Sequence, residues 1–305
     1  MASFILIFLC LGAGLLLRRA ALLNAQMIHG LNRFVVYVAL PAVTLLQIHT
    51  LQISSDFWVP VSMAWLQFAL GILFFLVLKR FLNLQAATFG ALLLTSSLGN
   101  TSFVGVPLLE ALYGTSALAT GILTDQPGTF CVLGTVGVVA ASIISQGRPS
   151  FSHVLKRIFC FPPFLALLLA LFLRPFALPL PLTGVLEKLS ATLIPVALVA
   201  VGAQLSISSE IFRRKRSLLM IGLIFKLILV PFTMYAFYDL ICGQRNQMTE
   251  ITIIESAMAP MITAAIVAEE YGFDAEIANL MVGIGIPASL LTVPLLWWFL
   301  HRSVD

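Results

Sequence analysis

A short polar sequence near position 100 has the residue types needed to bind a small anion. Gly99, Asn100, Thr101 and Ser102 follow one another inside an apolar stretch, and Pro107 comes soon after. Glycine and proline are poor helix formers, and proline lacks the N–H group that would continue a helix. A helix interrupted here would expose the free N–H groups of its second half and the positive end of its dipole. Such an end is suited to a carboxylate.

A second apolar stretch carries a similar interruption around Pro260. Pro260 is predicted to end one half-helix and to start another, with free N–H groups near Met261 and Thr263. Two such ends facing each other predict a substrate site with these members: Gly99, Asn100, Thr101, Ser102, Pro107, Ala259, Pro260, Met261 and Thr263. The alternative is a pair of ordinary kinks, because Gly and Pro are common in transmembrane helices. Interruptions at matching places in both halves favour the site.

Three ionisable residues, Asp125, Lys226 and Glu255, lie deep inside apolar stretches. Inserting a charged side chain at such a depth in the membrane costs at least ~2.5 kcal/mol, so each of these residues is by default a candidate for a functional role. A lysine with carboxylate partners would lower this cost and could bind or release a proton; the alternative is a static ion pair that fixes helix packing. Asp125 is the preferred partner of Lys226, and Glu255 is the second choice.

Neither a metal nor a cofactor is expected. The four histidines lie in loops and near the ends of apolar stretches, and the four cysteines show no ligand spacing. The sequence contains no GxxxxGK[ST], GxSxG or HExxH motif, so it offers no sign of direct ATP drive or of a hydrolase site.

The elements that must position these residues are membrane helices. The 305 residues are 60% hydrophobic and 10% charged, with a mean hydropathy of +1.05, whereas soluble domains are about 25% charged. No alternating strand pattern appears, so we predict an all-α polytopic membrane protein. The basic residues occur as short clusters between apolar stretches, which excludes a nucleic-acid surface and indicates cytoplasmic loops.

Ten spans are predicted, since a helix needs about 20 apolar residues to cross the hydrocarbon core. They cover about 2–17, 31–49, 57–78, 86–112, 115–145, 158–176, 189–206, 217–240, 249–270 and 277–300. With both termini outside, twelve lysines and arginines fall on the cytoplasmic side and four on the other, which sets this orientation in the plasma or inner membrane.

Five spans in each half predict an inverted duplication: a first repeat at 1–145, a cytoplasmic linker at 146–157 and a second repeat at 158–305. Pro41 and Pro195 both lie mid-span, and Tyr113-Gly114 and Tyr271-Gly272 end the fourth and ninth spans. Inverted repeats place a substrate site near the membrane midplane, where corresponding helices are interrupted.

Several of these segments together resemble the auxin efflux carrier family. They are Asn100-Thr101-Ser102-Phe103-Val104-Gly105-Val106-Pro107, Ala257-Met258-Ala259-Pro260, Val201-Gly202-Ala203-Gln204-Leu205, and Lys226 placed five residues before Pro231. The resemblance covers essentially the whole chain and is closest to the short bacterial members. It implies a scaffold of helices 1, 2, 6 and 7 and a moving core of helices 3–5 and 8–10, in which broken helices 4 and 9 cross. One departure is that the second break has a single proline and no asparagine, so backbone recognition is favoured there.

The leading hypothesis is a secondary transporter that moves a small organic anion, a carboxylate above all, by elevator-type alternating access. A proton or sodium ion is the candidate coupling ion, and a homodimer through the scaffold helices is left open. The alternatives are a sodium-coupled bile-acid-type symporter, which shares the expected architecture, and an anion channel or sensor on the same scaffold. An intramembrane enzyme would need a nucleophile–base pair or a metal cluster at depth, so it is disfavoured.

Overall fold

The computed structural model describes residues 2–51, 55–145, 160–205 and 209–302, and these residues form helices and no β-strand. The chain divides into two compact units. The first contains 1–55, 102–122 and 156–206, and the second contains 56–101, 123–155 and 207–305. The linker predicted at 146–157 lies outside the described residues.

The first unit combines two helical segments of the N-terminal half with one of the C-terminal half. In chain order its helices are α1 (Ala2–Arg19), α2 (Ala25–Phe34), η1 (Val35–Ala39), α3 (Leu40–His49), α6 (Val106–Tyr113), η4 (Thr115–Ala117), α7 (Leu118–Leu123), α10 (Pro162–Leu173), α11 (Leu180–Ser190) and α12 (Leu193–Gln204). It therefore takes in the predicted spans 1, 2, 6 and 7, together with the second half of span 4 and the first residues of span 5.

The second unit holds both helices that end at the predicted interruptions. Its helices are η2 (Ser55–Phe57), α4 (Trp58–Leu82), α5 (Ala86–Ser97), η5 (Thr124–Phe130), η6 (Leu133–Gly137), α8 (Val138–Ile144), α13 (Ser209–Ile224), η7 (Phe225–Leu229), α14 (Val230–Tyr235), η8 (Ala236–Ile241), α15 (Gln247–Ser256), α16 (Ile262–Glu270) and α17 (Ala275–Arg302). η3 (Thr101–Gly105) begins in this unit and continues into the first.

The length and composition of the helices are those of a multi-pass membrane protein. Six described helices are long and apolar enough to cross a bilayer, and three shorter apolar helices cover Ala86–Ser97, Thr101–Tyr113 and Pro162–Leu173. Large apolar side chains such as Leu73, Phe232 and Leu291 are exposed, as expected where a helix faces lipid. The count of ten spans, the inverted repeat and the orientation of the termini stay predictions.

Prolines explain two of the places where these helices change pitch. Leu40, just before Pro41, donates its N–H to the carbonyl of Val35. Val230, just before Pro231, donates to Phe225 in the same way. These bonds span five residues, which is the π-helical pattern. Because a proline inside a helix clashes with the carbonyl four residues earlier and offers no N–H, the preceding turn widens. The sequence analysis located the prolines but did not predict the π-helical turns.

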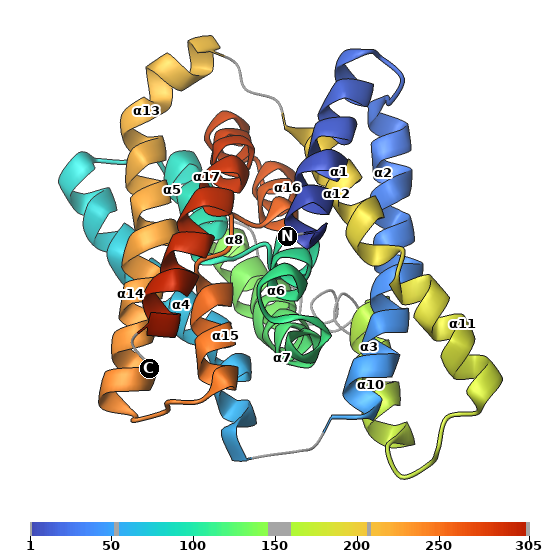
Figure 1. The fold of residues 1–305 in the computed structure, drawn as a ribbon. Helices are drawn as coiled ribbons and strands as arrows, with labels where there is room; N and C mark the ends of the chain where they lie inside the picture. The colour runs from blue at the N-terminus through green and yellow to red at the C-terminus, as the bar shows by residue number, and fades with distance from the viewer. Residues whose placement is uncertain (1, 52–54, 146–159, 206–208, 303–305) are drawn as a thin grey trace. The chain divides into compact units, whose positions relative to one another are not determined.

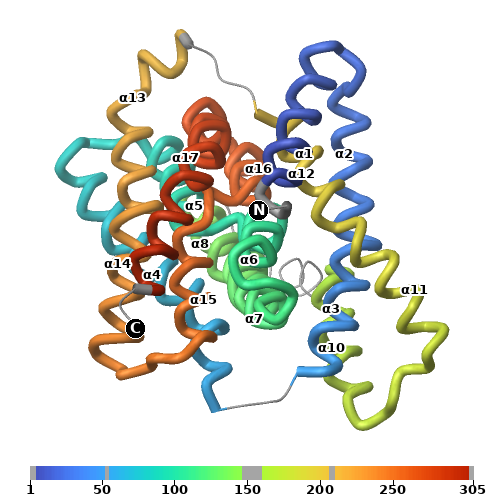
Figure 2. The backbone as a smooth tube through the Cα atoms, viewed as in Figure 1, coloured from blue at the N-terminus to red at the C-terminus, as the bar shows by residue number. Residues whose placement is uncertain are grey.

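Helices α1 and α12 contact each other along their length and pack backbone to backbone; they lie next to each other in Figures 1 and 2. A Cβ atom on Gly14 would lie 2.1 Å from the carbonyl oxygen of Val199, and one on Gly202 would lie 2.1 Å from that of Leu11. Small residues at helix contacts are typical of membrane proteins, where close van der Waals packing rather than the hydrophobic effect joins helices.

We predict that Gly14→Ala destabilises the protein by about 1–3 kcal/mol, because the new methyl group meets backbone that cannot move aside. The control is Gly12→Ala on the same helix, since a Cβ there has no neighbour within 4 Å. Thermal unfolding in detergent measures both variants. Equal melting temperatures for the two would contradict the packing argument.

An ionic cluster joins three helix ends of the second unit. Lys215 on α13 donates to Oδ2 of Asp274 at 2.6 Å and lies 2.9 Å from the carboxylate of Glu276. Thr88 also donates to Asp274. Burial by itself would raise the pKa of Asp274, but the hydrogen bonds from Lys215, the N–H of Ile277 and Thr88 hold this pKa below its ordinary value.

The lowered pKa of Asp274 sets a pH dependence of stability. A carboxyl with a depressed folded-state pKa stabilises the protein above its unfolded pKa, about 4, and this contribution is lost as the pH falls through the lower folded value. We predict that Asp274→Asn lowers stability by about 1 kcal/mol at pH 7 and makes progressively less difference below pH 4. Melting temperatures across this pH range test it, with the exposed Glu269→Gln as control. A difference that stays constant with pH would show that the carboxylate charge is not involved.

Candidate functional site

The two interrupted helices of the second unit are joined at their breaks. α5 ends at Ser97 and α15 ends at Ser256, and α16 starts at Ile262, beyond Pro260. Gly99 and Pro260 form an isolated antiparallel bridge. In this bridge the N–H of Asn100 donates to the carbonyl of Ala259 at 2.7 Å, and the N–H of Met261 donates to that of Leu98 at 3.0 Å. Each break therefore provides hydrogen-bond partners for backbone groups that are left without a partner in their own helix at the other break.

Carbonyl groups at the ends of both half-helices receive side-chain donors from neighbouring helices. Gln67 on α4 donates to the carbonyl of Ser97 at 2.8 Å, and Lys226 on η7 donates to the carbonyl of Ser256 at 2.7 Å. In each pair the donor precedes the acceptor by 30 residues. Equal spacing in the two halves of the chain is a feature expected of a duplication. Gln67 was not among the site residues predicted from the sequence. It precedes Ser97 by the same 30 residues by which Lys226 precedes Ser256, and this equal spacing was a signal that could have identified it.

Glycines on adjacent helices make room for the breaks. A Cβ atom on Gly71 would overlap Oγ of Ser97, and one on Gly285 would lie 2.3 Å from Cδ of Pro260. Gly99 itself has Nζ of Lys226 next to it, at 3.2 Å from where its Cβ would be. The ammonium therefore reaches the bridge because position 99 has no side chain.

Lys226, Glu255 and Asp125 form one electrostatic cluster. Lys226 and Glu255 are fully buried, and Asp125 is 3% exposed. Glu255 interacts electrostatically with both Lys226 and Asp125, while Thr101 donates to Oδ1 of Asp125 at 2.6 Å. Neither carboxylate oxygen of Glu255 has a hydrogen-bond partner among the described residues. Glu255, which was the second choice from the sequence, thus acts on the charge of Lys226. Asp125, the first choice, acts on Glu255 and accepts a hydrogen bond from Thr101, and its pairing with Lys226 stays a prediction.

Both Asp125 and Lys226 lie on π-helical turns. η5 contains Asp125 and Pro127, and η7 contains Lys226 and ends just before Pro231. Because a π-helical turn inserts an extra residue, it rotates the side chains on either side relative to a regular helix, and such turns are frequent at functional sites. The prolines therefore help to set the directions in which these two charged side chains point.

The first turn of α16 offers free backbone donors. The helix starts after Met261, which makes no side-chain cap, and its first intrahelical bond runs from the N–H of Ala265. Ile262 and Thr263 are half-buried. The predicted residues Gly99, Asn100, Thr101, Ala259, Pro260, Met261 and Thr263 thus belong to one part of the second unit, together with the charge cluster. Ser102 and Pro107 belong to the first unit.

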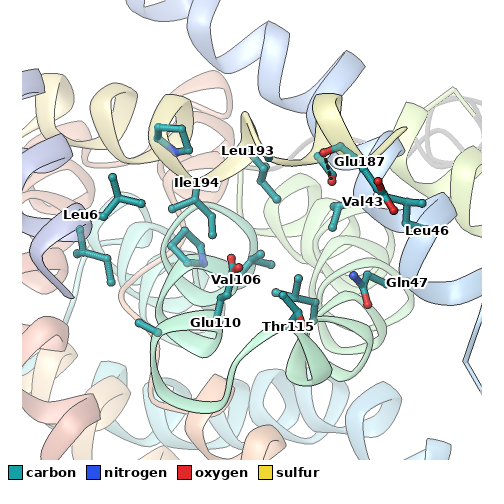
Figure 3. Close-up of a pocket in the computed structure, with 17 residues that line it drawn as sticks. Leu6, Val43, Leu46, Gln47, Val106, Glu110, Thr115, Glu187, Leu193 and Ile194 are labelled. Carbon is teal, nitrogen blue, oxygen red and sulfur yellow. Dashed lines mark hydrogen bonds between the residues drawn. The ribbon is translucent and has the colours of Figure 1, made fainter. Parts of the chain in front are cut away.

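The first unit contains a cavity of about 530 Å³, shown in Figure 3. It lies among α1, α3, α6, α11 and α12, and Pro107 is one of its lining residues. Most of the lining is apolar, and the polar members are Gln47, Glu110, Thr115, Glu187 and Ser190. Glu110 was not among the site residues predicted from the sequence.

Variants of Lys226 test whether this side chain acts through its hydrogen bond to the carbonyl of Ser256 or through its positive charge. Lys226→Met should cost about 3–5 kcal/mol, because it leaves Glu255 buried without its cation. Adding Glu255→Gln should recover most of this stability. Lys226→Gln introduces the donor that Gln67 already supplies at the other break, so it should keep the cap and lose only the charge.

Melting temperature and substrate counterflow, measured on the single and double variants, test this prediction. We expect Lys226→Gln to be folded and inactive. Full transport by Lys226→Gln would show that Lys226 serves only as a neutral cap.

Among the described residues no group of three His, Cys, Asp or Glu side chains could hold a metal ion.

A family model described as membrane transport protein matches residues 1–148 and 146–297. An uncharacterized transporter of Methanocaldococcus jannaschii is 27% identical over 279 residues, 88% of this chain and 89% of the relative. An uncharacterized transporter of Methanothermobacter thermautotrophicus is 26% identical over 286 residues, 92% of each. The chain belongs to the membrane transport protein family, the family of the auxin efflux carriers whose motifs it resembles.

Proposed function

We propose that this membrane transport protein is a secondary transporter for a small organic anion, with a carboxylate bound at the interrupted helices. The observation that carries the proposal is the start of α16. Its first N–H groups follow the Pro260 break without a side-chain cap, and Ile262 and Thr263 are half-buried rather than sealed. A helix N-terminus with free donors and its positive dipole end attracts a carboxylate.

The charge cluster supports a role in coupling. Glu255 is fully buried, its oxygens have no hydrogen-bond partner among the described residues, and Lys226 and Asp125 act on its charge. In this proposal the cluster of Asp125, Lys226 and Glu255 takes up a proton or responds to a sodium ion during transport. Alternating access is of the elevator type, with helices of the predicted spans 3–5 and 8–10 as the moving core.

Counterflow distinguishes this function from a channel or sensor on the same scaffold. A transporter exchanges labelled for unlabelled substrate against a gradient, whereas a channel gives flux that only follows the gradient. Repeating the measurement with and without sodium separates a sodium-coupled symporter from the other cases.

The binding prediction concerns Asn100. A thermal-shift screen of mono- and dicarboxylates on the purified protein, with and without sodium, should find stabilising anions, because a ligand bound only to the folded state raises the melting temperature. Asn100→Ala should weaken binding of such an anion about tenfold or more, because it removes a polar group from the break. Ser289→Ala is the control, since Ser289 is equally buried but bonds within its own helix.

A purely structural role of Asn100 would give a different result. If Asn100 only caps the break, the variant loses about 0.5–2 kcal/mol of stability and keeps its affinity for the anion. A lowered melting temperature with unchanged affinity would therefore remove Asn100 from the substrate site.

A further inference from the structure

The cavity of the first unit has the size and lining of a small-molecule site. Its volume of about 530 Å³ falls within the range of about 300–1,000 Å³ that is usual for such pockets. In Figure 3 Glu187 and Gln47 lie on the same side as Val43 and Leu46, and Glu110 lies nearer to Val106. Acidic and apolar side chains are thus mixed along the lining, so an organic molecule with a charged group and a short apolar chain can contact both kinds.

The charged side chains of the cavity lining are all acidic. Glu110 and Glu187 both line the cavity, and no Lys, Arg or His does. Among the described ion pairs of the chain none includes Glu110 or Glu187. Glu110 is half-buried, so solvent screens its charge only in part. An organic anion would meet repulsion here, and a cation would meet attraction.

We propose that this cavity binds an organic cation: an ammonium group held by Glu110 or Glu187, with a short apolar chain along the apolar side chains of the lining. Gln47, Thr115 and Ser190 supply further hydrogen-bond acceptors for the ammonium protons. A bare metal ion fits less well, because the described residues hold no cluster of three ligand side chains and most of the lining is apolar.

The site is distinct in chemistry from the proposed carboxylate site. That site uses backbone donors at the start of α16 in the second unit, whereas this one uses side-chain acceptors in the first unit. The inference therefore does not rest on the proposed function, and either can fail without the other.

Three probes of equal chain length test the charge preference: hexylammonium, hexanol and hexanoate. Binding is measured by calorimetry on the full chain in lipid nanodiscs, with empty nanodiscs subtracted to remove partition into lipid. Hexylammonium should bind about tenfold more tightly than either of the others, because hydrogen bonds between charged groups are the stronger ones. Equal or tighter binding of hexanoate or hexanol would overturn the proposal.

Variants assign the preference to the two glutamates. The double variant Glu110→Gln with Glu187→Gln should bind hexylammonium and hexanol within about twofold of each other, since only the charge has been removed. Glu187→Gln alone is a second test, which remains useful if the double variant does not fold, because Glu187 is exposed. This single variant should reduce the preference for hexylammonium in part. Glu210→Gln, an exposed carboxylate on α13, is the matched control and should keep the full preference. A preference that survives the double variant would overturn the assignment.

Discussion

The structure depends on the satisfaction of backbone hydrogen bonds where two helices stop inside an apolar environment. An unpaired N–H or carbonyl costs several kcal/mol in hydrocarbon, so an interrupted membrane helix must find partners elsewhere. Here the two interruptions supply each other, through the bonds of Asn100 with Ala259 and of Met261 with Leu98. Gln67 and Lys226 then donate to the carbonyls of Ser97 and Ser256 at the ends of the half-helices.

This constraint explains why the chemistry gathers at the breaks. A terminal carbonyl in a buried place attracts a cation, and Lys226 occupies that place at one break while neutral Gln67 occupies it at the other. The ammonium is buried and so requires negative charge nearby, which Glu255 supplies. In the proposed function, the side of the break that offers donors, at the start of α16, receives the ligand. Structural capping and the proposed transport chemistry therefore share the same few residues.

The two units differ in the charges they present to a small molecule. The second combines backbone donors with a buried cluster of one cation and two acids, Asp125 and Glu255. The first encloses a mostly apolar cavity with two glutamates, Glu110 and Glu187, and no basic side chain. Local potential rather than overall charge governs what binds, since the net charge of +4 comes from basic clusters near helix ends. Ligands of opposite charge suit the two places.

The sequence by itself determined the class of the protein and the positions of its interruptions, because composition, the lengths of apolar stretches and the local effects of Gly99 and Pro260 do not depend on distant contacts. It also singled out Asp125, Lys226 and Glu255, since a charge in an apolar stretch is conspicuous. Only the tertiary structure decided how these residues pair. The partners of Lys226, the role of Gln67 and the cavity around Glu110 all join segments far apart in the chain. Hydropathy and local spacing carry no information about which helices become neighbours, so these contacts appear only when the helices pack.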